Sequence, residues 1–149
     1  MPTMPIARDA ASAEFFDGTA RGELLLRRCT GCGRISAPQA RQCPDCAATE
    51  FTPAPASGAA TLVSWAVPHD REGRPLTVAA LVELAEGPWL RLRLTGVAEP
   101  AADLSAGLPL TVSFEAVADG ETVPVVSVAR EGRHETVDRI PAPQEGPTP

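Results

Sequence analysis

The chain contains no lysine and no tyrosine, and only 4% of its residues are aromatic. All 13 basic residues are therefore arginines, against 19 acidic residues, and the formal net charge is −6. Proteins that bind nucleic-acid backbones normally carry excess positive charge, because displacing phosphate counterions supplies most of the affinity. Binding of single strands also needs aromatic side chains on which bases stack. The lack of excess positive charge and the small number of aromatic residues both argue against a nucleic-acid partner.

Long apolar runs are also missing, although 44% of the residues are hydrophobic. A bilayer-spanning helix needs about 20 consecutive apolar residues, and the N-terminal stretch MPTMPIARDAASAEFF lacks the apolar segment of a secretory signal. We therefore expect no membrane span and a cytoplasmic location, where thiols stay reduced. A chain of 149 residues can form one domain with a core, or one domain plus a small appendage.

The first third of the chain is predicted to hold one short helix and one strand. Ser12 is placed to cap a helix of two or three turns that carries Phe15 and Phe16. The apolar run ELLLRR, 23–28, predicts a strand that leads into the first cysteine. The expected divisions here are a disordered lead over 1–11, a helix and cysteine module over 12–51, and a Pro/Ala/Gly connector over 52–58.

From residue 59 to residue 129 the apolar residues alternate with period two, which predicts strands. The first strand would place Thr61, Val63, Trp65 and Val67 on one face. Five strands with short turns favour a small barrel over 58–130, most commonly the five-stranded OB-fold, although a small sandwich also fits. A polar, Pro-rich tail is expected over 131–149. The five expected strands span 60–67, 76–85, 89–97, 110–118 and 122–130.

All the cysteines lie in one short stretch, CTGCGRISAPQARQCPDC, as two C-x-x-C pairs: Cys29, Cys32, Cys43 and Cys46. Four thiolates at this spacing are typical of tetrahedral zinc. Each pair needs a tight turn followed by a residue with positive φ, and Gly33 fills that place after the first pair. Ala47 takes it after the second pair. The ten-residue loop between the pairs favours a compact hairpin, as in a rubredoxin-like ribbon.

Other uses of the four thiols fit less well. A thioredoxin-type redox pair would need a helix start in a βαβ setting, which the sequence lacks, and disulfides would need an oxidising compartment. Iron also fits an all-thiolate tetrahedral cage. Because four protein ligands fill the coordination sphere, the predicted Zn²⁺ is structural rather than catalytic.

The cysteine module carries a small excess of positive charge. Between residues 21 and 51 there are five arginines and three acidic residues, whereas a zinc ion with four thiolates has a charge of −2. The simpler interpretation is that the arginines offset the cluster. The alternative is that part of this surface meets a phosphate-bearing ligand or an acidic partner.

The order of these motifs resembles the DUF35 family over about 12–130. The resemblance rests on a helix with a Phe-Phe pair, a strand entering C-x-x-C-G, a ten-residue loop and a five-strand pattern. Phe16 departs from the tryptophan expected in many relatives. The matching segments are FFDGTARGELLLRRCTGCGR (15–34), CPDC (43–46), GAATLVSWAV (58–67), LTVAALVEL (76–84) and GLPLTVSFE (107–115).

The resemblance implies an N-terminal rubredoxin-like zinc ribbon followed by an acyl-CoA-associated OB-fold. It further implies a non-catalytic accessory or scaffold subunit of an acyl-CoA-processing complex, in a hetero-oligomer. Its partner would be a thiolase-like enzyme, an acyltransferase, a hydratase or an aldolase, with a coenzyme A thioester shared between the subunits. Only the four cysteines carry over residue by residue as metal ligands.

The remaining candidate residues do not form a catalytic group in the sequence. His69, beside Asp70 in a polar loop, and His134, in the expected tail, are interpreted as solvent-exposed. Arg91 and Arg93 share one strand face, which is either a solvated barrel surface or a contact to coenzyme A phosphates or an acidic partner. The two tryptophans, Trp65 and Trp89, are expected in the core or at an interface.

Two alternative functions stay open from the sequence alone. A nucleic-acid-binding OB-fold and zinc-ribbon protein would use the same two modules, but the acidity and few aromatics oppose it. An independent acyl-CoA enzyme would need a catalytic group that no motif supplies, since all four cysteines are assigned to the metal. The sequence does not define the partner, the acyl group, the stoichiometry or any contact with coenzyme A.

Overall fold

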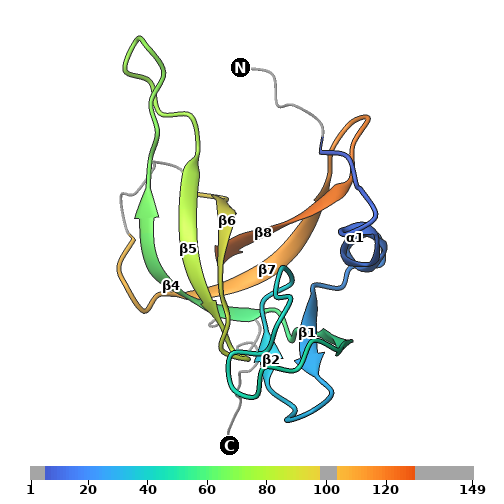
Figure 1. Ribbon diagram of the computed structural model, residues 1–149. Helices are drawn as coiled ribbons and strands as arrows, with labels where there is room; N and C mark the ends of the chain where they lie inside the picture. Colours follow the sequence, from blue (N-terminus) through green and yellow to red (C-terminus); the bar gives the residue numbers. More distant parts are fainter. Residues whose placement is uncertain (1–5, 98–103, 130–149) are drawn as a thin grey trace, which may run out of the picture.

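The computed structural model describes residues 6–97 and 104–129, and these form a mainly β structure with one short helix (Figure 1). The predicted fold class is confirmed. The expected tail over 131–149, with His134, and residues 1–5 of the expected lead lie outside the described residues. In the described ranges, no helix is long and apolar enough to cross a membrane. The elements are α1 (Ala13–Ala20), β1 (Leu25–Cys29), β2 (Ile35–Ser36), β3 (Phe51–Pro55), β4 (Ala59–Ala66), β5 (Val78–Leu84), β6 (Trp89–Thr95), β7 (Pro109–Ala116) and β8 (Thr122–Val128).

Strands β4 to β8 close into a barrel in the order β4-β5-β6-β8-β7. Strands β6 and β8 pair in parallel, and the other four pairs are antiparallel. This is the five-stranded Greek-key arrangement of the OB-fold, so the barrel is confirmed over the sandwich. Its interior is filled by alternate residues of each strand, because side chains of a strand point to opposite faces in turn; Leu62, Val82 and Val126 are almost fully buried.

Strand β4 does not keep one face inward along its length. Its first half buries Ala60 and Leu62, whereas Trp65 and Val67, further on, pack against the same core from positions of opposite parity. The register with β5 shifts between Leu62 and Ser64, which marks a β-bulge at Val63. A bulge adds one residue to the strand, so the side chains after it point to the opposite face from the one that strict alternation would give. The prediction that residues 61, 63, 65 and 67 share one face is therefore wrong for the part of the strand that precedes the bulge.

The helix α1 begins and ends close to the predicted residues. Ser12 occupies the N-cap position, but its hydroxyl makes no capping bond and instead bonds with Asp9. At the other end, Gly22 has a φ of 82° and Glu23 N–H donates to Gly18 O at 2.8 Å. Together with the bond from Gly22 N–H to Thr19 O, this is a Schellman motif, in which a left-handed glycine stops the helix.

Helix α1 lies against the start of β8, at the side of the barrel (Figure 1). Thr19 is buried, and its hydroxyl donates to the carbonyl oxygen of Thr122 at 2.7 Å. Gly18 lets the helix approach β1, since a Cβ atom at this position would lie 2.6 Å from Cγ of Leu25. The glycine that weakens the helix thus permits its packing.

A second, three-stranded sheet in the order β2-β1-β3 carries the cysteines. The connector predicted over 52–58 is wrong for 52–55, because those residues form β3, which pairs with β1 from Leu25↔Pro55 to Cys29↔Phe51. Prolines are tolerated there because β3 is an edge strand. Leu24, Leu26 and Ala54 of this region join the barrel residues in one hydrophobic core, so the sheet is packed directly on the barrel.

Candidate metal centre and the adjoining groove

The four cysteines lie on two turns of nearly identical geometry. In the first turn, Gly33 N–H donates to Cys29 O at 2.9 Å, and in the second, Ala47 N–H donates to Cys43 O at the same distance. Gly33 has a φ of 83° and Ala47 a φ of 65°, so both residues adopt the left-handed conformation predicted for them. Alanine reaches this region only at a steric cost. The structure confirms the paired turns.

Backbone bonds from the flanking chain hold each turn. Cys29 N–H donates to Arg34 O and Cys43 N–H to Ala48 O, each at 2.8 Å. The Arg34 guanidinium also bonds both carboxylate oxygens of Asp45, at 3.0 and 3.1 Å, which ties the first turn to the second. Arg34 is therefore paired with an acid and not with the thiols, and so is Arg21, which pairs with Glu23.

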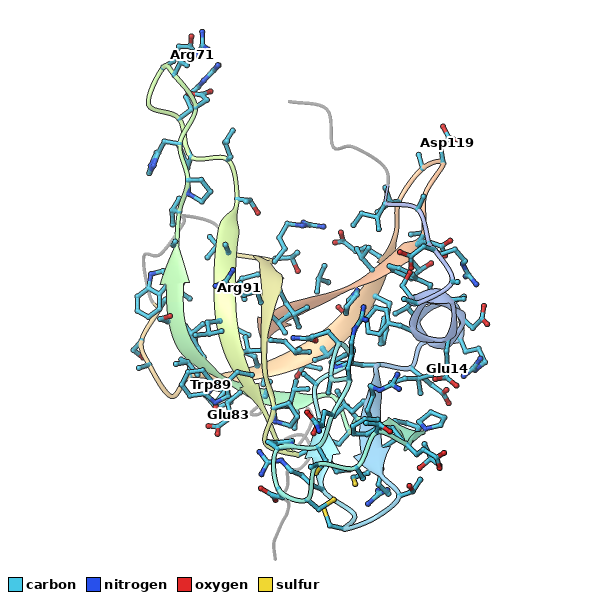
Figure 2. The ribbon with its side chains drawn as sticks, in the orientation of Figure 1. Glu14, Arg71, Glu83, Trp89, Arg91 and Asp119 are labelled. Carbon is cyan, nitrogen blue, oxygen red and sulfur yellow. The ribbon has the colours of Figure 1, made fainter. Side chains whose placement is uncertain are left out.

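The four sulfur atoms come within 4.8 Å of one another. The Sγ atoms of Cys29 and Cys46 are 3.5 Å apart, as are those of Cys32 and Cys43. A tetrahedral zinc ion with Zn–S bonds of about 2.3 Å requires S–S separations of about 3.8 Å. The cage thus has the size and the donor set that such an ion needs. Figure 2 shows the sulfurs, in yellow, at the end of the molecule opposite the β4–β5 hairpin tip.

Ionisation of these thiols is strongly interdependent. Backbone hydrogen bonding from Cys32, with a further bond from Gly31, lowers the pKa of Cys29 to about 7. For Cys32, a backbone bond from Arg34 favours the thiolate, but the contact with Cys43, desolvation and the other thiols outweigh it and raise the pKa to about 12. Four adjacent thiolates repel one another, and a divalent cation held between them would let all four deprotonate together.

Space around the sulfurs is tight at Gly31. Its N–H donates to Cys29 Sγ at 3.2 Å, and a Cβ atom at this position would lie 3.3 Å from Cys46 Sγ. Cys29 and Cys43 are buried, whereas Cys32 and Cys46 are exposed. One side of the cage therefore faces the protein and the other faces solvent.

The structure separates the remaining predicted residues from the cysteines. His69 is exposed and pairs with Pro75 in the β4–β5 hairpin, whose tip carries the labelled Arg71 (Figure 2). Arg91 and Arg93 are both exposed on β6, as the alternation predicted, and Arg93 pairs with Glu115.

The two tryptophans divide between core and surface. Trp65 packs against the core, whereas Trp89 is 53% exposed and lies opposite Glu83 at the β5–β6 end (Figure 2).

A groove of about 930 Å³ lies between α1, the loop that joins the two cysteine pairs, and strands β6 and β8. Phe15, Leu90 and Val123 give it an apolar lining, and Arg27, Arg41 and Arg91 give it positive charge. The sequence places Arg27 and Arg41 in the basic surface of the module but does not distinguish them from its other arginines. The sequence holds only a weak sign that these two arginines lie beside β6, because that proximity depends on contacts between segments far apart in the chain.

Known proteins share both the fold and parts of the sequence. A family model described as the C-terminal OB-fold domain of ChsH2 matches residues 54–115. A solved chain described as Ltp2-ChsH2(DUF35) aldolase superimposes with a TM-score of 0.69 at 27% identity, over 87% of this chain and all of that chain. A DUF35 protein of unknown function from Sulfolobus solfataricus shares the fold, with a TM-score of 0.59 at 20% identity, over 80% of this chain and 86% of that chain.

A curated relative from Thermomonospora curvata is described as a probable enoyl-CoA hydratase alpha subunit. It is 30% identical over an alignment of 128 residues that covers 83% of this chain, and this chain spans 39% of the relative's length. A four-cysteine sheet joined to an OB-fold barrel defines the general class of this protein. Within that class, the chain is similar to DUF35 proteins, in the sequence of its barrel and in its fold.

Proposed function

We propose that the protein is a zinc-binding, non-catalytic accessory subunit of an acyl-CoA-processing complex. The observation that carries the proposal is the similarity over the whole of the solved chain described as Ltp2-ChsH2(DUF35) aldolase. The Thermomonospora curvata relative, described as a hydratase subunit, supports the same broad class of substrate. The partner in a hetero-oligomer would be a thiolase-like enzyme, an acyltransferase, a hydratase or an aldolase.

The metal proposal assigns Zn²⁺ to Cys29, Cys32, Cys43 and Cys46. Support comes from the matched turns, the short sulfur separations and the purely thiolate donor set. Because the four sulfurs fill a tetrahedral sphere, the ion would hold the β1–β3 sheet together and leave no position for a substrate. Iron fits the same ligands, and metal analysis of the protein purified under reducing conditions distinguishes the two.

The proposed accessory role is supported by the placement of the reactive groups among the described residues. All four thiols belong to the proposed metal site, and His69 sits on the hairpin away from it. The bond-making groups would then come from the partner, with the coenzyme A thioester held where the two subunits meet. The domain limits proposed for such a subunit are the ribbon within 12–51, extended by β3, and the OB-fold within 58–130.

Co-purification tests this function. The full chain, tagged in its source organism, is expected to bring down a stoichiometric acyl-CoA enzyme subunit, identified by mass spectrometry. The partner's turnover of its acyl-CoA substrate should fall when this subunit is removed and return when it is added back. Turnover by the isolated chain would contradict the non-catalytic role, and absence of any acyl-CoA enzyme from the purified complex would contradict the function.

A nucleic-acid-binding role is the weaker alternative. The groove offers two aromatic residues, but Phe16 is buried and forms an edge-on pair with Phe15, with ring centroids 5.2 Å apart. The buried ring of Phe16 and the edge-on pair do not provide the exposed ring faces on which bases stack. A salt-dependent shift of labelled single-stranded DNA by the pure protein would favour this alternative.

A further inference from the structure

Strand β6 is paired on both edges for only part of its length. Its last residues pair in parallel with β8, from Arg93↔Val125 to Thr95↔Ser127, whereas Trp89 to Leu92 pair only with β5 in the described part of the chain. Figure 1 shows β6 and β8 diverging from the segment where they meet. This segment of β6 therefore has an unpaired edge, and its residues Leu90 to Leu92 line the groove.

The register identifies which backbone groups face this edge. Leu84 N–H donates to Pro88 O, so positions 84 and 88 form a hydrogen-bonded pair. Such pairs recur at every second residue of an antiparallel ladder, which assigns Leu90 and Leu92 to bonds with β5. The backbone N–H and C=O groups of Trp89 and Arg91 consequently point away from β5. An unpaired row of this kind is a template for another strand.

The opposite wall of the groove carries a cation without an acceptor. Arg27 stacks on Phe51, with Cζ 4.9 Å from the ring centroid, and its Nε atom is buried without a hydrogen-bond partner among the described residues. Its cross-strand neighbour Ser36 is 8% exposed, and its hydroxyl also lacks a partner there. A buried donor left unpaired costs free energy, and the side chain of Arg27, which has no acid partner among the described residues, lines the groove.

The charges of the groove are unbalanced although the whole chain is acidic. Within the described residues, Arg27, Arg41 and Arg91 form no ion pair, and the carboxylate that lines the groove, Asp9, is already bonded to Ser12. Carboxylates are the protein groups that match a guanidinium most closely. The net charge of the groove thus favours an acidic occupant.

We infer that this groove binds an extended acidic segment of a partner protein, which adds as a strand to the free edge of β6. Its backbone pairs with Trp89 and Arg91, its carboxylates meet Arg27, Arg41 and Arg91, and its alternate apolar side chains contact Phe15 and Leu90. This mode of binding combines main-chain hydrogen bonds with alternating side-chain contacts. The inference rests on the proposed function, because it gives the acyl-CoA enzyme partner a surface on which to dock.

The direct test uses a fluorescent peptide of alternating valine and glutamate and the full chain. Binding is expected to shift the backbone amide resonances of Trp89 and Arg91 and to weaken as salt is raised. Arg91→Glu and Arg41→Glu, both at exposed positions, should each weaken binding about tenfold or more. Arg71→Glu is the matched control, because this exposed arginine lies at the hairpin tip away from the groove (Figure 2), and it should leave the affinity unchanged.

Two control peptides separate charge from strand pairing. A valine-glutamine peptide should bind about tenfold more weakly or worse, and so should the acidic peptide methylated on alternate backbone nitrogens. Equal affinity for either control, or an equal loss in Arg71→Glu, overturns the inference. So does Arg91-dependent binding of coenzyme A with no binding of the acidic peptide, which would assign the groove to a phosphate ligand.

The outcomes also separate the inference from the function on which it rests. If the peptide binds with the expected pattern but the purified complex contains no acyl-CoA enzyme, the proposed function is contradicted and the inference about the groove still holds. If an acyl-CoA enzyme co-purifies equally with wild type and Arg91→Glu while the peptide does not bind, the inference about the groove is overturned and the proposed function is not.

Discussion

The hydroxyl of Thr19 in α1 donates a hydrogen bond to the carbonyl oxygen of Thr122 at the start of β8, at 2.7 Å. The two residues are 103 positions apart, and Thr19 is 1% exposed. This bond satisfies the carbonyl oxygen of Thr122 before β8 reaches its pairing with β6 at Val125, and it fixes α1 at the end of the groove. The helix, the barrel and the groove wall are thus joined at one buried polar contact.

Replacing Thr19 by valine keeps the side-chain volume and removes the donor. The part-buried carbonyl oxygen of Thr122 then lacks this partner, and we expect the free energy of unfolding to fall by about 1–3 kcal/mol. Urea unfolding followed by circular dichroism measures the change. Thr52→Val, at an exposed position of β3, is the control and should stay within about 0.5 kcal/mol of wild type; equal effects of both changes would contradict the role of the bond.

Replacing Cys32 by serine should abolish stoichiometric zinc binding. Structural zinc in small modules contributes on the order of 10 kcal/mol of binding free energy, so the β1–β3 sheet is expected to unfold. The barrel should survive with lower stability, because Leu24 and Leu26 belong to its core. Elemental analysis and hydrogen exchange test both parts. Gln39→Ser, at an exposed loop position, should retain the metal, and unchanged metal content in Cys32→Ser would refute the site.

The two cysteine turns should respond oppositely to exchange of alanine and glycine. Ala47→Gly removes a left-handed alanine at φ 65° and should raise the free energy of unfolding by about 1 kcal/mol. Gly33→Ala introduces the same strain at φ 83° and should lower the stability of the metal-loaded protein by about as much. Thermal unfolding with metal content held constant measures both changes. Shifts of the same sign would show that backbone strain is not the cause.

Acid should weaken the attachment of the N-terminal segment to the β7–β8 turn. Hydrogen bonding from Arg8, at 2.8 and 2.9 Å, lowers the pKa of Glu121 below its ordinary value of 4.5. A carboxylate with a lowered pKa stabilises the folded state above its ordinary pKa, and this stability is lost as the pH falls through the lowered value. Wild type should therefore exceed Arg8→Gln in stability at neutral pH, and the two should converge below pH 4.5. Urea midpoints across this range check it, and a constant difference at all pH values would contradict it.

Local patterns were enough to predict most of the secondary structure. Strict alternation along β6 placed Leu90, Leu92 and Leu94 inward and the arginines outward, because a regular strand has a side-chain period of two. The pattern failed in β4, where the bulge at Val63 reverses the facing. The stretch 52–55 was assigned to a connector because of its prolines, but its pairing with β1 makes it an edge strand.

Residues close together in the chain are enough to specify the cysteine turns and the five-strand pattern. The spacing of Cys29 and Cys32 sets the first turn and that of Cys43 and Cys46 the second, and the left-handed conformations of Gly33 and Ala47 follow from these turns. By contrast, Arg27, on the ribbon, and Arg91, on the barrel, line one groove beside an unpaired strand edge only because of how distant segments pack. That meeting depends on the divergence of β6 from β8 and on the shared core, which are long-range packing results that no local periodicity encodes.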